Sequence, residues 1–499
     1  MTVTSIGGRT ATSIQSLVDL RDTLNDLQRQ LSTGKRSATY AGLGIDRGVS
    51  VSLRSQLSAI ASFDSTADNV QTRINVAQLS LGRFADIGSS VKSSLIRGGF
   101  GTSATASAAQ TNAKASLDEL LSLLNSRAGD HYLFSGRATD QPAVETYDHI
   151  INGDGARAGL KQLIDERNQA DLGASGLGRL AITTPTANSV SVAEDAVSPF
   201  GFKLASVTSN LTNATITGPA GAPAAISVDL SGGNPNVGDD ITFRLTLPDG
   251  SSENLTLKAT SNSPPATNEF TIGATTATTT TNLQGALTTA LGKLASTALT
   301  AASAAKASSE FFSADANNPP ARVSGPPFAS ATALTAGSAA DTVIWYTGEA
   351  GSDPARSTAT TRIDPSLSVS YGVRANEVGI RTLVQSVATL AATTISPTDP
   401  NGADLSAAIN KRLVTNLSGP PGTQTVADIE ADLASAQVSI NTAKSRHQQQ
   451  NATLGSFLDH IEGVSNEEVG VKILSLQTRL QASLQVTSLL YQTSLVKFL

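Results

Sequence analysis

Few residues in this chain have the types and spacing that catalysis or metal binding requires. The four histidines are His131, His149, His447 and His460, and none pairs with another at the i, i+4 spacing that holds a metal ion on one helix face. We expect His447 and His460 to be solvated or packed side chains of a helix. The chain has no cysteine, which excludes disulfides, thiolate catalysis and cysteine-bound metals.

The glycine and acid clusters have simple structural explanations. The segment 173–178 holds three glycines, but its spacing does not fit a dinucleotide-binding loop, and we expect a linker. Asp239-Asp240 precedes an expected strand, and Glu467-Glu468 falls in the first turn of an expected helix, where acids interact favourably with the helix dipole. We therefore predict no catalytic residue, no cofactor and no metal site, and we predict that the protein is not an enzyme.

The elements that dominate the chain are long amphipathic helices at both ends. Near the start, leucines recur with alternating spacings of three and four, the pattern of a coiled-coil seam, at Leu17, Leu20, Leu24, Leu27 and Leu31. This predicts a helix over 13–31 with Gly34 as its C-cap. A second stripe predicts a helix over 49–96, which at 1.5 Å per residue spans on the order of 70 Å.

The far end repeats the pattern. Helices are expected over 426–461 and from Asn466 to the end of the chain, and their apolar stripe runs through Leu476 and Leu480 and widens at Leu484, Leu489 and Leu490. Such a stripe can also build an ordinary intramolecular bundle. Apolar residues continue to Leu499, however, and chain ends are usually polar unless they dock. We therefore predict inter-subunit packing through Leu17, Leu20, Leu24, Leu27, Leu31, Leu476, Leu480, Leu484 and Leu490.

The middle of the chain predicts strands. Apolar and polar residues alternate from Ile241 to Leu247, the turn Pro248-Asp249-Gly250 follows, and the alternation resumes at Leu255. A helix is expected over 283–303, and a second hairpin between 343–346 and 361–373. The predicted fold class is α+β: a long helical coiled coil or bundle formed by the N- and C-terminal regions, with a β-rich inserted domain in the middle.

Composition narrows the classes of protein. Of the 499 residues 39% are hydrophobic and 15% charged, and the net charge is −6 without any run of Lys or Arg, so no nucleic-acid partner is expected. No run of about 20 apolar residues predicts a membrane span. The first residues lack the apolar core of a cleavable secretion signal, which favours a cytoplasmic protein or export by a route that needs no such signal.

Several motifs resemble those of the bacterial flagellin family. Leu31-Ser32-Thr33-Gly34-Lys35-Arg36 is similar to a signature that follows the first helix of that family, and Tyr132-Leu133-Phe134-Ser135-Gly136 to a turn after its long helix. The resemblance covers about residues 1–150 and 340–499, and more loosely the insert. Many flagellins continue after the signature with Asn-Ser-Ala-Ala-Asp-Asp, whereas this chain has Ser37-Ala38-Thr39-Tyr40-Ala41-Gly42.

The resemblance implies a structural subunit of the flagellar filament, used for swimming motility. The chain would be exported unfolded by the flagellar type III apparatus into the extracellular flagellum, with itself, an export chaperone, and hook-associated and cap proteins as partners. Three domains would follow: 1–40 plus 460–499 lining the tube, 41–182 plus 340–459 as a wall bundle with β-hairpins, and 183–339 as a β-rich surface insert. Residues 1–35 and 465–499 are expected to order on assembly.

Two alternatives remain open. The hook–filament junction protein shares the family's fold, and the Tyr132–Gly136 turn and the segment around Trp345 are common in it. A secreted adhesin on a helical stalk is a weaker alternative, because the insert has few of the aromatic side chains that sugar-binding platforms use.

Overall fold

The chain has a mixed α+β fold with a long N-terminal helix and several small sheets. The computed structural model describes residues 4–97, 103–396, 398–419 and 421–496, and describes their side chains except at 4–11, 13, 97, 103–108 and 490–496. The described residues divide into two compact units. The first draws on Met1–Val70, Thr361–Val369 and Val438–Leu499, and the second on Gln71–Thr360 and Ser370–Gln437.

Helices make up most of the first unit. They are α1 (Thr4–Thr33), the 3-10 segment η1 (Tyr40–Asp46), the first part of α2 (Arg47–Arg97), the last part of α10 (Val426–Glu462) and α11 (Asn466–Val496). The helices predicted over 13–31, 49–96, 426–461 and from Asn466 are therefore confirmed. Gly34 has a φ of 67° and its N–H donates to Gln30 O at 2.8 Å, the expected glycine termination of α1.

The second unit contains seven further α-helices among its described residues. They are α3 (Ser103–Leu124), α4 (Tyr147–Asn152), α5 (Leu160–Leu172), α6 (Thr276–Leu294), α7 (Thr300–Ser313), α8 (Val378–Ala392) and α9 (Gly402–Leu417). The helix predicted over 283–303 is thus part of α6 and α7, which are joined by a π-helical turn, Ala295–Leu299. The hydroxyl of Thr275 accepts from the N–H of Thr278 and caps α6.

A four-stranded sheet contains the predicted hairpin. Its order is β10-β9-β8-β5, and its strands are β5 (Lys203–Ser209), β8 (Asp240–Thr246), β9 (Ser252–Thr260) and β10 (Glu269–Thr271). β8 and β9 are antiparallel, with Phe243 opposite Leu255, so the hairpin read from the alternation is confirmed. β10 adds to β9 in parallel.

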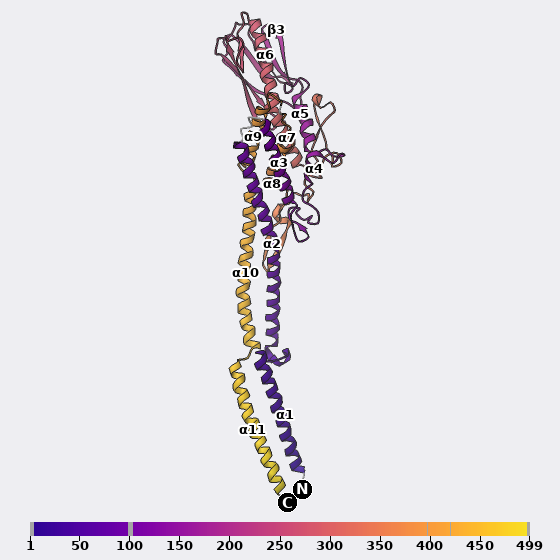
Figure 1. Ribbon diagram of the computed structural model, residues 1–499, viewed down its shortest axis with the longest axis vertical. Helices are drawn as coiled ribbons and strands as arrows, with labels where there is room; N and C mark the ends of the chain where they lie inside the picture. The colour runs from indigo at the N-terminus through magenta and orange to yellow at the C-terminus, as the bar shows by residue number, and fades with distance from the viewer. Residues whose placement is uncertain (1–3, 98–102, 397, 420, 497–499) are drawn as a thin grey trace. The chain divides into compact units, whose positions relative to one another are not determined.

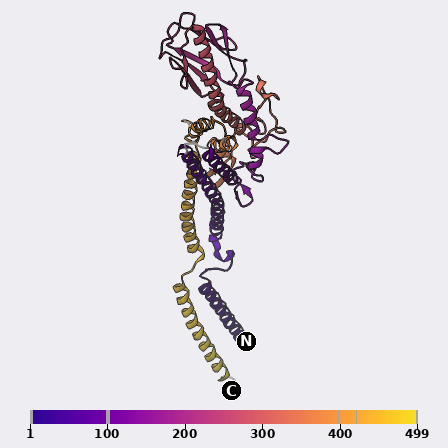
Figure 2. The ribbon, with the colours of Figure 1, turned by 45° about the horizontal axis from the view of Figure 1, so that its top comes forward.

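A second four-stranded sheet shares a core with the first. Its order is β3-β4-β7-β6, and its strands are β3 (Leu180–Thr186), β4 (Ser189–Glu194), β6 (Thr215–Ala220) and β7 (Ala225–Asp229). Buried side chains of both sheets pack with Leu283, Leu287 and Leu291 of α6 in one hydrophobic cluster. Figure 2 shows α6 running along these strands.

The remaining strands are short, and one prediction about them is wrong. The pairs are β1 (Arg127–Ala128) with β2 (His131–Tyr132), β11 (Arg322–Val323) with β12 (Leu334–Thr335), and β13 (Thr360–Asp364) with β14 (Leu367–Ser370).

The predicted hairpin between 343–346 and 361–373 does not form. Residues 343–346 are buried without alternation, Tyr346 bridges Val144, and Trp345 Nε1 donates to Phe312 O at 2.9 Å. A fully buried apolar run carries no strand periodicity, so its partner could not be read from the sequence.

Candidate assembly interface

Helices α1 and α11 lie side by side in the first unit (Figure 1). They run in opposite directions, because Lys35 just after α1 forms an antiparallel bridge with Gly463 just before α11. Neither helix contains a proline, so each can continue for about 30 residues. The pair is therefore a two-helix antiparallel arrangement that carries all the side chains predicted to pack between subunits.

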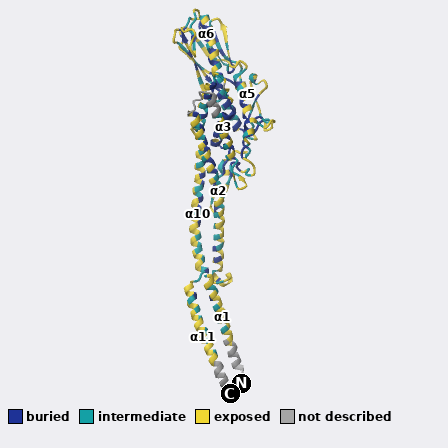
Figure 3. Cartoon of the chain, in the orientation of Figure 1, coloured by how far each residue is buried: buried dark blue, intermediate teal, exposed yellow. Residues whose placement is uncertain are grey.

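The predicted residues are only partly covered. Leu27 is buried. Five others are half-buried: Leu17, Leu20, Leu24, Leu476 and Leu480. Leu31 and Leu484 are exposed, at 42% and 51%, and the side chain of Leu490 lies outside the described part of the chain. Among the described side chains of α1 and α11, only those of Leu27 and Val469 are buried. Figure 3 shows the described parts of both helices mainly in the colours of exposed and half-buried residues.

Helix α11 is apolar on two sides. Val469, Ile473, Leu476 and Leu480 follow one face and are buried or half-buried. At 100° per residue a second stripe lies opposite, and its apolar members are all exposed: Val471, Leu474, Ala482 and Val486, with the polar Thr478 between them. Val471 and Leu474 are 67% and 65% exposed. A helix normally buries its apolar faces, and α1 covers only one of the two apolar faces of α11.

Glu462 organises the junction from which both helices extend. Its Oε1 accepts from Ser50 Oγ at 2.6 Å and from Arg54 Nε at 2.8 Å, and Lys35 Nζ lies 3.9 Å from Oε2. The backbone N–H of Arg36 donates to Glu462 O at 2.7 Å. The hydrogen bond from Arg54, aided by Ser50 and opposed by burial, lowers the pKa of Glu462 to about 2.

Above this junction, α2 and α10 are linked by paired side chains. His447 is 1% exposed, and its Nδ1 lies 2.7 Å from Asp64 Oδ1. Arg446 donates to Asp364 Oδ2 at 2.6 Å, which connects the β13–β14 turn to α10. His447 is thus a packed histidine of the helix seam, while His460 is exposed. Among the described residues, no group of three or more His, Asp or Glu side chains is arranged to hold a metal ion.

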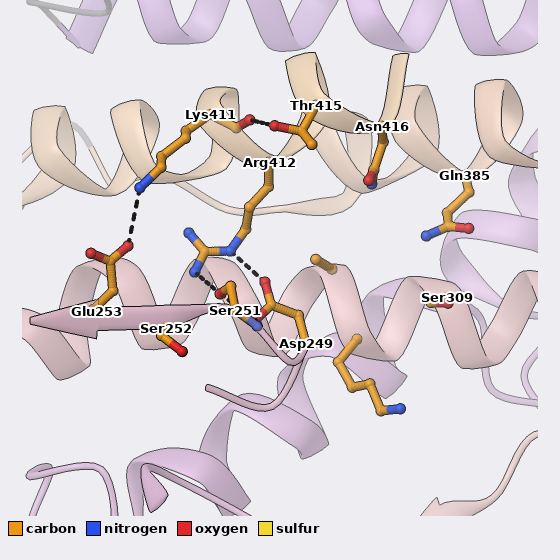
Figure 4. Close-up of a pocket in the computed structure, with 12 residues that line it drawn as sticks. Asp249, Ser251, Ser252, Glu253, Ser309, Gln385, Lys411, Arg412, Thr415 and Asn416 are labelled. Carbon is orange, nitrogen blue, oxygen red and sulfur yellow. Dashed lines mark hydrogen bonds and ion pairs between the residues drawn. The ribbon is translucent and has the colours of Figure 1, made fainter. Parts of the chain in front are cut away.

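The second unit has a polar pocket of about 410 Å³, drawn in Figure 4. It lies where the β8–β9 turn meets α7, α8 and α9. Arg412 donates to Asp249 Oδ2 at 2.7 Å and to Ser251 Oγ at 3.1 Å, and Lys411 lies 3.4 Å from Glu253. These charges pair with one another and thereby join the hairpin to α9. The residues that line the pocket include no nucleophile paired with a base.

The leucine spacing predicted the helices α1 and α11, but no sequence pattern indicated the junction or the pocket. Glu462 is separated from Arg54 by 408 positions, and Arg412 from Asp249 by 163, so no local spacing signals either pair. One sequence feature indicates a cationic partner for Glu462: it lies in the last turn of a helix, where a negative charge opposes the helix dipole.

Comparisons with known proteins do not identify the chain: no family model matches it, and no curated protein does. Within the described residues, none of the helices is both long enough and apolar enough to cross a membrane.

Proposed function

We propose that this protein is a structural subunit of a bacterial flagellar filament, exported unfolded and polymerised through α1 and α11. The single observation that carries the proposal is the second apolar stripe of α11, from Val471 to Val486, which α1 leaves exposed. Covering it would contribute roughly 1–2 kcal/mol for each large side chain. Other copies of the same chain are always present to cover this stripe, which favours a homopolymer.

The flagellin-like motif supports the proposal through its position. Gly34 of Leu31-Ser32-Thr33-Gly34-Lys35-Arg36 ends α1, Lys35 lies beside Glu462, and the N–H of Arg36 donates to Glu462 O. These residues therefore set the direction in which α1 leaves the junction, a geometric role that a family signature would retain. In this proposal α1 and α11 form the coiled coil lining the tube, and the β-rich residues of the second unit form the outer insert.

Seeded polymerisation of the purified chain tests the proposal. Sheared seeds should elongate into long tubes visible by electron microscopy, and Leu24→Asp should block elongation because it places a charge in the half-buried seam of α1. Val197→Asp is the matched control, since Val197 is 72% exposed in the part of the second unit that is assigned to the outer insert. The single tryptophan, Trp345, is fully buried in that unit, so its fluorescence checks that the mutant remains folded there.

The outcome also separates the filament from the junction alternative. A junction adaptor is present in few copies and should not elongate readily by itself. Wild-type protein that stays monomeric with seeds would therefore contradict the filament proposal and favour the adaptor. Filaments grown from Leu24→Asp at the wild-type rate would contradict the role given to α1.

A further inference from the structure

The side chain of His447 is buried between two carboxylates that come from different segments of the first unit. Its Nδ1 lies 2.7 Å from Asp64 Oδ1 of α2, and its Nε2 lies 3.4 Å from Asp364 Oδ2 in the β13–β14 turn. The histidine is 1% exposed, and Nε2 is buried without an aligned hydrogen bond. Buried polar atoms normally have a partner, so the protonation of this ring decides how well the three side chains fit together.

A neutral imidazole does not suit both carboxylates, because it donates from one ring nitrogen and accepts at the other. With the proton on Nδ1, the lone pair of Nε2 faces the carboxylate of Asp364. With the proton on Nε2, the lone pair of Nδ1 faces the carboxylate of Asp64. Only the imidazolium offers an N–H to each carboxylate, and hydrogen bonds between charged groups are stronger than those between neutral groups.

The other charged side chains beside the ring have partners of their own. On α10, Arg446 donates to Asp364 Oδ2 at 2.6 Å, and Lys444 pairs with Asp68 of α2. On β13, Arg362 donates to the backbone carbonyl of Asp364 at 3.2 Å. These contacts place a cation on the turn whatever the charge of the histidine, so the turn keeps one anchor to α10 at every pH.

Both carboxylates are available to a charged ring. Burial raises the pKa of Asp364, but hydrogen bonds from the N–H of Ser366 and from Arg446, together with the charge of Arg446, outweigh it and lower the pKa. Asp364 is therefore ionised at neutral pH. Among the described residues, Asp64 forms its one ion pair with His447.

The turn is the part of this cluster that can move. The helices on either side of the ring are fixed by buried side chains, Ala67 and Val70 of α2 and Ile440 and Ala443 of α10. In contrast, β13 and β14 form a two-stranded sheet, which is marginally stable by itself, and residues 365–366 at its tip are exposed. A cleft of about 460 Å³ borders both the turn and the ring, so water can enter when the turn moves.

We infer that His447 is a pH-sensitive clasp that holds the β13–β14 turn against α2 and α10. At low pH the charged ring bridges Asp64 and Asp364. As the pH rises through the range in which histidine side chains lose their proton, a lone pair comes to face a carboxylate and the turn opens more often. Contacts that favour the protonated ring stabilise the closed turn at low pH, and this contribution is lost at higher pH. The inference concerns the monomer and does not depend on the filament proposal.

Hydrogen exchange of the full chain, kept as unseeded monomer in a series from about pH 5 to about pH 9, tests the clasp. After correction for intrinsic exchange rates, amides of residues 361–369 should exchange about tenfold faster at the high end of the series, the effect of one charge-assisted hydrogen bond. Nitrogen-15 NMR of the His447 ring follows its protonation in the same samples. Protection of the turn should fall over the interval in which the ring loses its proton. Protection that is constant across that interval would overturn the inference.

A pair of histidine variants separates the clasp from other effects of pH. His447→Gln keeps a donor but carries no charge, so protection of the turn at low pH should fall toward the wild-type value at high pH. His460→Gln is the matched control on the same helix, because His460 is exposed and its Nδ1 lies 2.8 Å from the backbone oxygen of Ser456 rather than a carboxylate. It should retain the wild-type pH response. An unchanged pH response in His447→Gln would show that the ring is not the sensor.

A second variant leaves the buried ring in place. Asp64→Asn replaces one carboxylate by an amide that can donate to Nδ1, so a neutral ring can donate from Nε2 to Asp364 and satisfy both neighbours. Most of the pH response of the turn should disappear. Lys444→Gln breaks the neighbouring pair with Asp68 without touching the ring, and should keep the response. The inference is wrong if Asp64→Asn responds like the wild type, or if Lys444→Gln loses the response to the same extent.

Discussion

Ser50 and Glu462, 412 positions apart in the sequence, are joined by a hydrogen bond of 2.6 Å from Ser50 Oγ to Glu462 Oε1. Ser50 lies in the first turn of α2, the helix that follows α1, and Glu462 is the last residue of α10, the helix that precedes α11. The hydrogen bond therefore joins α2 to α10 at the point from which α1 and α11 extend. Arg54 and Lys35 add positive charge to the same carboxylate. The directions of both terminal helices therefore depend on one buried acid.

The first prediction concerns the pH dependence of this junction. The pKa of Glu462 is about 2 in the folded chain, against 4.5 as its ordinary value. Because the pKa of Glu462 is lower in the folded than in the unfolded chain, its ionised carboxylate stabilises the folded state fully above pH 4.5. This contribution is lost as the pH falls from 4.5 toward 2. We expect Glu462→Gln to lower the free energy of unfolding by about 2–3 kcal/mol at pH 7. Near pH 2 the variant and the wild type should have similar stability. Hydrogen exchange of the first turns of α2 measures both differences.

A matched ion pair provides the control for that experiment. Arg83 and Glu119 also form a close pair, but both side chains are about half exposed. Glu119→Gln should leave the stability nearly unchanged at any pH, because an ion pair exposed to water contributes little to folding. Equal effects of Glu462→Gln and Glu119→Gln at pH 7 would contradict the importance given to the junction.

The second prediction concerns the link between the β8–β9 turn and α9. The side chain of Arg412 is 9% exposed and that of Asp249 15%, so removing one partner leaves the other charge nearly buried. Arg412→Ala should destabilise the second unit by about 3 kcal/mol, followed by Trp345 fluorescence in a denaturant titration. Lys411→Ala should cost little, because Lys411 is 73% exposed in its pair with Glu253. Indistinguishable midpoints for the two variants would show that the Arg412 pair is not structural.

The elements that could be predicted are those with a local period. The leucine spacing gave α1, and the alternation from Ile241 to Leu247 gave the β8–β9 hairpin, because each pattern is complete within one element. The hairpin expected from residues 343–346 failed because four consecutive buried side chains carry no period. Glu462 and its partners were out of reach for another reason: three separate segments meet there, and only the fold brings them together.

The leucine seam also shows what a period leaves undetermined. Leu27 and Leu31 share one predicted stripe, yet Leu27 is buried and Leu31 is 42% exposed. α1 ends at Thr33 and α11 begins only at Asn466, so the stripe reaches the end of its covering helix near Leu31. Heptad spacing thus identifies the face but not the length over which a partner covers it.

The third prediction follows from the small number of buried side chains in α1 and α11. Helices of this length are marginal in water without tertiary packing. In the monomer, amides of residues 12–33 and 466–489 should exchange much faster than those of 53–70 and 438–460, where Leu53, Ala67, Val70, Ile440 and Ala443 are buried. In the polymer the difference should largely disappear. Equal protection of the two sets in the monomer would refute ordering on assembly.

The last prediction isolates the exposed stripe of α11. The double substitution Val471→Ser with Leu474→Ser changes side chains that are 67% and 65% exposed, so the stability and helix content of the monomer should stay nearly the same. If copies of the chain cover this stripe, the substitution removes roughly 2–4 kcal/mol from each subunit contact, and the critical concentration should rise by about 30-fold or more. Val197→Ser with Val237→Ser, at exposed valines of the second unit, is the control and should leave polymerisation unchanged. Because the two double variants remove similar apolar area from water-facing positions, a difference between them can come only from where that area lies. Equal critical concentrations would mean that the second face of α11 stays in water in the filament, and the proposed assembly through that face would be wrong.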